Sequence, residues 1–355
     1  MPDSQSTSEA LIGPSKFSLT VWLGRHKDKL WWLHSAYALF LGIGIMWLGG
    51  RNYTFLRVTV FHVGFIWLSS LFLPKLLNHP HLSERWRLRL RLFINFFNKN
   101  LYQQVLFFVL PIYFASATLS SGNCIFVVLL GISAVLSTLD VVYDRHLSVR
   151  QSLTAIFFAF NLFALINVML PVLWSVSNTW TTRISAVLAA IGFATLYNPF
   201  SQPRRLRVEF GVLAVTLLLV GVEFGRFFIP PAPLRVVSAQ FGSEFQQESM
   251  RVAPELTVLE PGGTKQLYGL TAIKAPLGLS ERVQHRWYKN GKLFWASPYY
   301  EVTGGRDQGF RLWTRVTMDS IEPGMTVRID VETEGGQLIG RAGIETLRRK
   351  SDLPP

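Results

Sequence analysis

Hydrophobic and polar residues follow two different patterns in the two parts of the chain. Up to about residue 229, long apolar runs alternate with short basic connections. Beyond Pro233, short segments alternate apolar and polar residues between glycine-rich turns. A continuous apolar run of about 20 residues is typical of a helix that crosses a bilayer, whereas period-two alternation is typical of a strand with one buried face. The sequence therefore predicts a helical membrane domain followed by a β-domain.

Seven apolar segments are candidate membrane spans. They are 30–49, 56–74, 102–119, 123–143, 152–174, 182–198 and 209–229. The third and sixth have the shortest uninterrupted apolar cores, so whether they cross the bilayer completely stays open. Two consecutive prolines, Pro230 and Pro231, end the last segment. The expected division of the chain is an N-terminal segment 1–29, a transmembrane domain of about seven helices 30–229, and a C-terminal domain 230–355.

The C-terminal domain is expected to contain seven strands. They are Arg235–Gln240, Gln266–Ala272, Val283–Tyr288, Lys292–Ala296, Arg311–Thr317, Thr326–Glu332 and Gln337–Glu345. The dipeptide Asn290-Gly291 favours a two-residue hairpin turn because both turn positions need φ > 0. Short strands at this spacing predict an all-β, immunoglobulin-like antiparallel sandwich. The segment 241–264 has no clear pattern and is compatible with a loop or an extra strand.

Basic residues lie almost entirely on one side of the predicted helices. Fifteen lysines and arginines fall before the first segment or in the connections after the second, fourth and sixth segments. The opposite connections hold Arg51 and Arg183, with Arg57 and Arg226 near helix ends. Because basic connections stay in the cytoplasm, the N-terminus is predicted to be cytoplasmic. An odd number of spans then places the C-terminal domain in the periplasm, with the protein multi-pass in the inner membrane of a Gram-negative bacterium.

The net charge of +13 follows from that distribution. The first 229 residues carry a net charge of +11 and the remainder only +2. A nucleic-acid-binding protein would carry its basic stripe on a soluble face, so we expect the lipid bilayer rather than a nucleic acid as the partner of these charges. The basic stretch 84–99 is either an amphipathic helix on lipid headgroups or a cytoplasmic connector. Cys124 is the single cysteine, which excludes an intrachain disulfide.

Polar groups inside predicted spans are candidates for function because burying them in lipid is costly. The candidates are Asp140, Glu223, Asn161 and Asn167. Glu223 lies three residues before Arg226, which is the spacing of an ion pair on one helix face. Asp140 lies near the cytoplasmic end of its segment. Both carboxylates therefore also have a purely structural interpretation.

A second group of candidates lies on the predicted strands. Arg286, Trp287, Arg311, Trp313 and Arg315 combine the two residue types that stack on sugars and bind carboxylates. On the strand 311–317, the two arginines and Trp313 share one face at period two, whereas consecutive residues point to opposite faces. The group is therefore either an interaction face or a structural ladder of cross-strand pairs.

Three stretches of the β-domain carry a family resemblance. "HRWYKNGKLFW" (285–295), "RLWTRVTM" (311–318) and "GMTVRIDVETEGGQLIGRAGIE" (324–345) resemble the signature of DUF2914, a bacterial domain family of unknown function. The resemblance extends over roughly 235–347, although Thr326 stands where an aromatic residue is common. The membrane half resembles the DUF5924-like region that accompanies this domain in some proteobacterial proteins. The resemblance implies no known activity, substrate or cofactor.

Two functions fit the sequence best. The first is a non-enzymatic inner-membrane protein that displays a periplasmic β-sandwich, which binds another envelope protein or a glycan through a strand edge or the arginine–tryptophan group. The second is a transporter or membrane sensor with the β-domain as a regulatory cap. An envelope enzyme that uses a carboxylate is a third, weaker hypothesis. We recognise no catalytic, metal-binding or phosphate-binding motif, so no catalytic residue, metal or cofactor is expected.

Overall fold

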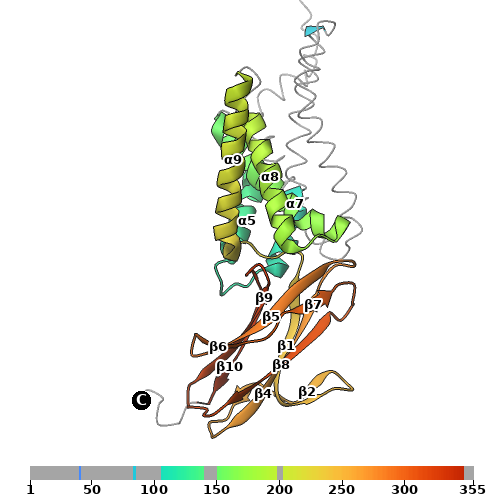
Figure 1. The fold of residues 1–355 in the computed structure, drawn as a ribbon, viewed down its shortest axis with the longest axis vertical. Coiled ribbons are helices and arrows are strands. Elements are labelled where there is room, and N and C mark those ends of the chain that lie inside the picture. Colours follow the sequence, from blue (N-terminus) through green and yellow to red (C-terminus); the bar gives the residue numbers. More distant parts are fainter. Residues whose placement is uncertain (1–39, 41–82, 85–104, 140–149, 198–202, 348–355) are drawn as a thin grey trace, which may run out of the picture.

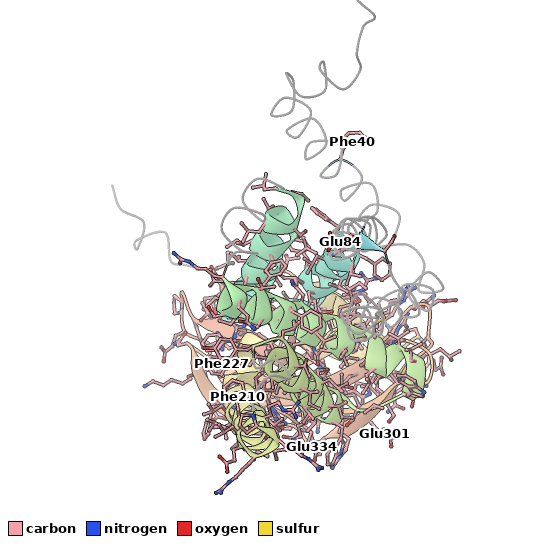
Figure 2. All side chains as sticks on the ribbon, turned by 90° about the horizontal axis from the view of Figure 1, so that it is seen from above. Phe40, Glu84, Phe210, Phe227, Glu301 and Glu334 are labelled. Atoms are coloured by element: carbon pink, nitrogen blue, oxygen red, sulfur yellow. The ribbon has the colours of Figure 1, made fainter. Side chains whose placement is uncertain are left out.

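The molecule has a helical part and a β-sandwich that follow one another along its long axis (Figure 1). The computed structural model describes residues 40, 83–84, 105–139, 150–197 and 203–347. In the view from above, the helices lie over one end of the sandwich (Figure 2). The order of the elements therefore follows the two hydrophobic patterns of the sequence.

The described helices are antiparallel neighbours around a shared apolar core. They are Val105–Ser116, α5 (Cys124–Thr138), α7 (Gln151–Trp174), α8 (Asn178–Tyr197) and α9 (Arg204–Gly225), which continues as the 3₁₀ turn η2 (Arg226–Phe228). The core contains Tyr113, Phe126 and Leu130, with Phe163 and Val168 from α7. α7 is central, because α5 and α8 both pack against it, whereas α9 packs against α8.

The expectation of about seven transmembrane helices followed by a sandwich is wrong in its helical half. Among the described residues, two helices are long and apolar enough to cross a membrane, Gln151–Trp174 and Arg204–Phe228. They correspond to the expected segments 152–174 and 209–229. The segments 30–49 and 56–74 lie outside the described residues.

The remaining three segments fail for physical reasons. The helices Val105–Ser116 and Cys124–Thr138 have 12 and 15 residues. At 1.5 Å per residue these described helices extend about 18 and 22 Å, less than the hydrocarbon thickness of about 30 Å, while residues 102–104 and 140–143 of the expected segments lie outside the described residues. α8 has 20 residues, but its first two turns contain several threonines and Arg183, which makes it too polar. Long apolar runs in the sequence therefore overestimated the number of spans.

The two long apolar helices have very different surroundings. Of the most apolar stretch of α7, 67% is buried within the protein, whereas the corresponding value for α9 is 11%. Exposed apolar side chains cover α9 along its length, among them Val212, Leu217 and Phe224. α7 is thus the centre of the helical core, and α9 presents most of its apolar surface outward.

The β-domain consists of ten strands. They are β1 (Arg235–Gln246), β2 (Arg251–Leu256), β3 (Val258–Leu259), β4 (Lys265–Lys274), β5 (Ser280–Lys289), β6 (Lys292–Ala296), β7 (Tyr300–Thr303), β8 (Phe310–Met318), β9 (Thr326–Thr333) and β10 (Leu338–Thr346). All seven strands expected from alternation are present, so the β-rich C-terminal domain is confirmed. β2 and β3 lie in the segment 241–264, which was compatible with a loop or an extra strand, and β7 was not expected. These strands are short or contain a proline such as Pro254.

The strands form two sheets that face each other. One sheet has the order β2-β1-β4-β8 and the other β3-β10-β9-β5-β6, with β7 also paired to β5. All described strand pairs are antiparallel except β3 with β10. Asn290 and Gly291 both have positive φ, as the predicted β5–β6 hairpin turn requires. Consecutive strands repeatedly cross from one sheet to the other, which is typical of Greek-key sandwiches.

The centre of the sandwich is the fully buried Trp287 on β5. Its indole lies edge-on to Phe241 of the opposite sheet, and its Nε1 donates a hydrogen bond of 2.9 Å to Thr314 Oγ1 on β8. Gly269 on β4 leaves the space that this ring and Ile329 fill, because a Cβ atom at position 269 would collide with both side chains. One glycine therefore sets how closely the two sheets approach at the largest core residue.

We expect Gly269→Ala to destabilise the sandwich by about 1–3 kcal/mol, the usual cost of overpacking a core. Gly263→Ala is the matched control, because a Cβ at position 263 meets nothing within 4 Å. Thermal unfolding of the purified protein, followed by near-ultraviolet circular dichroism, measures both variants. Equal midpoints for the two variants would show that Trp287 and Ile329 are not packed against this glycine.

Candidate functional site

The helical part and the sandwich meet in a continuous polar contact, which we call the docking seam. Three connections at the same end of the helices form its upper side, residues 117–123, 175–178 and 226–234. On the sandwich side, the seam is formed by the start of β5 and by the β9–β10 turn with the first part of β10. Buried polar groups must find partners, so the seam also determines how the two parts fit together.

Asn178, the first residue of α8, is the centre of the docking seam. Its backbone N–H donates a hydrogen bond of 2.6 Å to Glu281 Oε2 on β5, and its side-chain amide donates to Gln337 Oε1. Gln337 Nε2 in turn donates a hydrogen bond of 2.9 Å to the carbonyl oxygen of Ile229, at the end of the last helix. Asn178, Glu281 and Gln337 are all buried. The sandwich thus supplies the carboxylate that satisfies the first N–H of α8.

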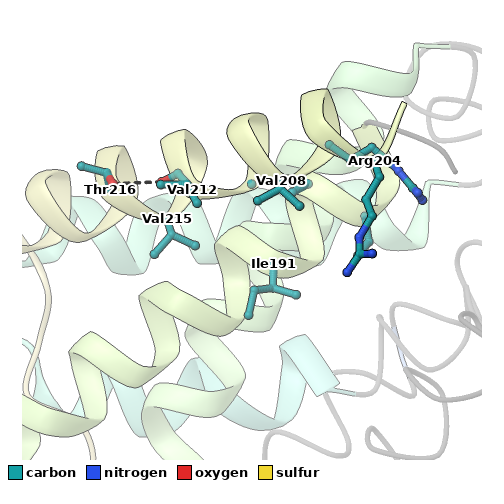
Figure 3. Close-up of a pocket in the computed structure, with 10 residues that line it drawn as sticks. Ile191, Arg204, Val208, Val212, Val215 and Thr216 are labelled. Atoms are coloured by element: carbon teal, nitrogen blue, oxygen red, sulfur yellow. Dashed lines mark hydrogen bonds between the residues drawn. The ribbon is translucent and has the colours of Figure 1, made fainter. Parts of the chain in front are cut away.

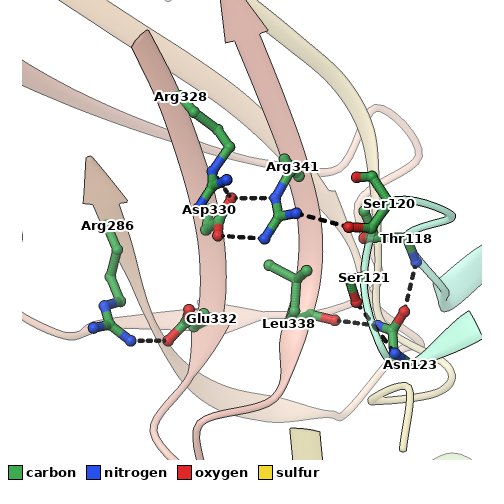
Figure 4. Close-up of polar contacts among 10 residues, drawn as sticks. All are labelled: Thr118, Ser120, Ser121, Asn123, Arg286, Arg328, Asp330, Glu332, Leu338 and Arg341. Atoms are coloured by element: carbon green, nitrogen blue, oxygen red, sulfur yellow. Dashed lines mark hydrogen bonds and ion pairs between the residues drawn. The ribbon is translucent and has the colours of Figure 1, made fainter. Parts of the chain in front are cut away.

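A second set of contacts joins the sandwich to the connection before α5 (Figure 4). Asn123 Nδ2 donates a hydrogen bond of 3.2 Å to the carbonyl oxygen of Leu338, while its Oδ1 accepts one from the N–H of Thr118. Arg341 Nη1 donates a hydrogen bond of 3.0 Å to the carbonyl oxygen of Ser120. Asn123 is fully buried, so this contact also excludes water.

Arg341 also belongs to a row of ion pairs on the outer face of β5, β9 and β10 (Figure 4). Asp330 accepts two hydrogen bonds from Arg341, at 2.7 and 2.8 Å, and lies 3.1 Å from Arg328. Glu332 pairs with Arg286 at 2.8 Å. We call these five residues the charge ladder. The Arg341 guanidinium links the ladder to the docking seam, and its interaction with Asp330 raises the pKa of Arg341.

The Glu281 carboxyl is the buried acidic group of the docking seam. Its burial raises the pKa of Glu281 above the ordinary value, and the hydrogen bond from the Asn178 N–H acts in the opposite direction. The nearby negative charge of Glu334 raises this pKa further. The carboxylate is therefore less stable here than in water, and protonation of Glu281 favours the docked arrangement.

The structure does not bring the predicted arginine–tryptophan group together on one surface. Trp287 points into the core between the sheets, whereas Arg286 lies on the opposite face of β5 and belongs to the charge ladder. Consecutive strand residues point to opposite faces, as the sequence indicated. Trp287 is consequently a packing residue, and it offers no surface for a ligand.

Arg311, Trp313 and Arg315 do share the outer face of β8, on the other sheet. The Trp313 ring stacks on Phe245 with a centroid distance of 4.4 Å. The Arg311 guanidinium donates hydrogen bonds to the carbonyl oxygens of Ser249 and Met250, in the turn of the β1–β2 hairpin. The hairpin thus covers this part of the sheet. Of the three, Arg315 is exposed.

His285 is enclosed by hydroxyl groups in the sandwich core. Its two ring nitrogens lie 2.8 Å from Thr271 Oγ1 and Thr314 Oγ1, and the side chain is fully buried. Burial lowers the pKa of His285 to about 3, so the imidazole is neutral at physiological pH. With both nitrogens bonded inside the core, His285 stabilises the fold and has no access to a substrate.

Of the four polar residues expected inside the spans, two are held by neighbours, one has no hydrogen bond among the described residues, and one lies outside them. Glu223 pairs with Arg226 at 2.7 Å, as the spacing suggested, and with Arg183 on α8 at 3.0 Å. Asn167 bonds to Tyr113 and Thr182. The buried amide of Asn161 makes no hydrogen bond within the described part. Asp140 lies outside the described residues.

The residues of the docking seam were not predicted from the sequence. Asn123, Asn178 and Gln337 are polar residues at element ends, where a solvated position is the ordinary expectation. The signal that was present is Asn178 at the start of α8, because asparagine is common where helices begin. Across the described ranges, no three histidine, cysteine or carboxylate side chains are grouped so that they could hold a metal ion.

We expect Glu281→Gln to remove a pH dependence of the docking seam. The amide can still accept the hydrogen bond from Asn178 but carries no charge. Since the folded-state pKa of Glu281 lies above its ordinary value of 4.5, the wild type loses stability relative to the variant as pH rises through that raised pKa. The unfolding midpoint of Glu281→Gln minus that of the wild type should therefore grow as the pH rises above about 4.5.

Glu248→Gln is the control for this titration, because Glu248 lies exposed in the β1–β2 turn. Comparing each variant with the wild type at the same pH cancels the contributions of His285 and other groups. A difference for Glu281→Gln that stays constant with pH, or that resembles the control, would contradict a buried, proton-sensitive carboxyl at the seam.

Comparisons with known proteins divide the chain near the middle of the sandwich. Residues 16–269 match a family of unknown function, DUF5924, and residues 280–343 match a protein family of unknown function, DUF2914. No curated protein matches the chain. A solved structure of Pseudomonas fluorescens alkylpurine DNA glycosylase AlkC, bound to DNA containing an abasic-site analogue, shares 10% identity at a TM-score of 0.22 over 86% of this chain and 99% of that one. A score this low carries no argument about fold or function. The DUF5924 match covers most of the chain and is followed by DUF2914, so the chain belongs to the DUF5924 family and carries a DUF2914 region at its C-terminal end.

Proposed function

We propose that this protein is a non-enzymatic membrane protein that holds a β-sandwich against the outer face of the bacterial inner membrane as a binding module for another envelope protein. The observation that carries the proposal is the docking seam. It fixes the sandwich at one end of the helices and allows little freedom between the two parts, because its buried hydrogen bonds would be lost on separation.

The exposed surface of α9 supports a membrane location. This helix is 11% buried along its most apolar stretch, and apolar side chains such as Leu213, Leu217 and Phe224 face outward. In water, a contiguous apolar surface of this kind would favour aggregation, whereas lipid satisfies it. α7 alone would not support a membrane location, since it is mostly buried within the protein.

The distribution of arginines supports an outward-facing sandwich without any count of spans. Arg150, Arg204, Arg205 and Arg207 lie at the helix ends that are remote from the sandwich. Nearer the sandwich, the described helices α8 and α9 with η2 carry two arginines, Arg183 and Arg226, which share Glu223 as their partner. Because basic helix ends stay in the cytoplasm, the sandwich belongs on the other side.

The open edge of β6 supports a binding role through strand addition. β6 is the last strand of its sheet, and nothing among the described residues pairs with its outer edge. Leu293 and Phe294 on this strand are 45% and 38% exposed. Monomeric proteins usually protect such an edge with charges, a bulge or a cover, whereas peptide-binding domains use it to pair with an extended segment. Arg311 and Trp313 are engaged by the β1–β2 hairpin, which leaves β6 as the better candidate surface.

We expect a photo-crosslinking amino acid at position 293, introduced in living cells, to give a discrete adduct with an envelope protein. Position 237 on β1 is the matched control, because Val237 has the same exposed fraction as Leu293, 45%, on the other sheet. The adduct should form from position 293 and be absent from position 237. Adducts with cytoplasmic proteins, or identical adducts from both positions, would contradict the proposal.

A further inference from the structure

Large apolar side chains face outward at the level of the docking seam. At least one of them lies in or directly beside each of the three helical connections that form the seam, and their exposed fractions range from 40% to 74%. We call them the apolar collar. They are Leu119, Trp174, Trp180, Phe227 and Phe228.

The length of α9 places the apolar collar at the outer boundary of a bilayer. Arg204 lies at the start of this helix, and apolar residues such as Val208 and Val212 follow along it (Figure 3). From Arg204 to Phe228 the helix rises by 24 residues, or about 36 Å at 1.5 Å per residue. A hydrocarbon core of about 30 Å that begins just beyond Arg204 therefore ends close to Phe227 and Phe228.

The two tryptophans of the collar fit this level as well. Tryptophan is enriched where headgroups meet acyl chains, because its ring is apolar and its N–H is polar. The Arg183 guanidinium lies 5.3 Å from the centre of the Trp180 ring and pairs with Glu223. Charged groups and an exposed indole thus lie together at the end of the helices that carries the sandwich.

The sandwich brings an apolar residue of its own to the collar. Leu277, in the turn between β4 and β5, is 82% exposed. The next residue, Gly278, lies against the end of α7, because a Cβ atom at position 278 would collide with the hydroxyl of Ser175. Ser175 directly follows Trp174. Leu277 therefore lies beside the collar.

Backbone hydrogen bonds hold the turn 276–278 in place. The N–H of Leu279 donates a hydrogen bond of 3.2 Å to the carbonyl oxygen of Pro276. The N–H of Gly305 donates one of 3.1 Å to the carbonyl oxygen of Ala275. Gly278 has a φ of 87°, as the third residue of a type II turn requires. The exposed leucine is thus displayed at the tip of a defined turn, a place where polar residues are usual.

We propose that the turn 276–278 inserts the Leu277 side chain into the outer leaflet of the membrane, so that the sandwich contacts lipid directly. Apolar side chains at this depth are removed from water by the boundary between headgroups and acyl chains. The inference rests on the proposed membrane location of the helices. It gives the sandwich a second attachment beside the docking seam, and this attachment is to lipid.

Fluorescent labelling of the full-length protein in phosphatidylcholine vesicles measures the depth of the turn. In a Cys124→Ser background, Leu277→Cys, Phe224→Cys and Val258→Cys are each labelled with an environment-sensitive fluorophore. Phe224 is the control for lipid contact, because it lies on α9 and its exposed fraction of 80% matches that of Leu277. Val258 is the control for water contact. It is 42% exposed on β3 and pairs with Glu345, near the end of β10 that is remote from the seam.

Two quenchers distinguish lipid from water. A nitroxide carried on the acyl chain of the lipid should remove most of the emission at positions 277 and 224 and little of it at position 258. Iodide on both sides of the membrane should have the opposite effect, with strong quenching at position 258 alone.

Quenching of position 277 by iodide and not by the nitroxide, as at position 258, would overturn the inference. Protection of position 277 from both quenchers would overturn it as well, because protein, such as a second copy of the chain, would then cover the turn. If position 224 also behaved like position 258, the membrane location of α9 would fail too. If position 277 alone did so, that location would stand. The vesicles contain no partner protein, so the result is independent of the proposed binding role of β6.

Discussion

The rest of the structure depends on the pairing of buried polar groups where the helices meet the sandwich. A helix that begins in a buried place leaves backbone N–H groups without partners, and each one costs free energy unless a partner is supplied. Glu281 is the partner of the first N–H of α8. Gln337 accepts a hydrogen bond from the Asn178 side chain and donates one to the carbonyl oxygen of Ile229, at the end of the last helix. The sandwich therefore supplies hydrogen-bond partners that the ends of the helices need. The position of the sandwich relative to the helices therefore follows from the position of the helix ends.

The division between family models has a structural consequence. The DUF5924 match ends at residue 269, within β4, and the DUF2914 match begins at residue 280, at the start of β5. β1 and β4 face β5 and β9 across one core, and Trp287 on one side packs against Phe241 and Gly269 on the other. The two matched regions thus build a single sandwich. Together with the docking seam, this makes the helical region and the β-domain one structural unit.

Sequence patterns predicted the β-domain well and the helical domain poorly, for different physical reasons. Alternation with period two reports burial on one face of a strand, and every strand expected from it is present, including β6 with its Asn290-Gly291 turn. An apolar run indicates only that a segment avoids water. It could not show that α7 is buried within the protein whereas α9 exposes most of its apolar surface. The seam was not predictable because Asn178 and Gln337 meet across 159 residues. Arg286 and Trp287 are adjacent in the sequence but do not form one binding surface, since consecutive residues on a strand point to opposite faces.

Labelling from one side of the membrane tests the central claim most directly, namely that the sandwich lies across the bilayer from the basic helix ends. In a Cys124→Ser background, single cysteines replace Glu248, exposed in the sandwich, and Arg205, exposed at the start of α9. The account predicts that a membrane-impermeant maleimide applied to intact spheroplasts labels position 248, and labels position 205 only after the membrane is opened. Labelling of position 205 in intact spheroplasts, or protection of position 248, would contradict it.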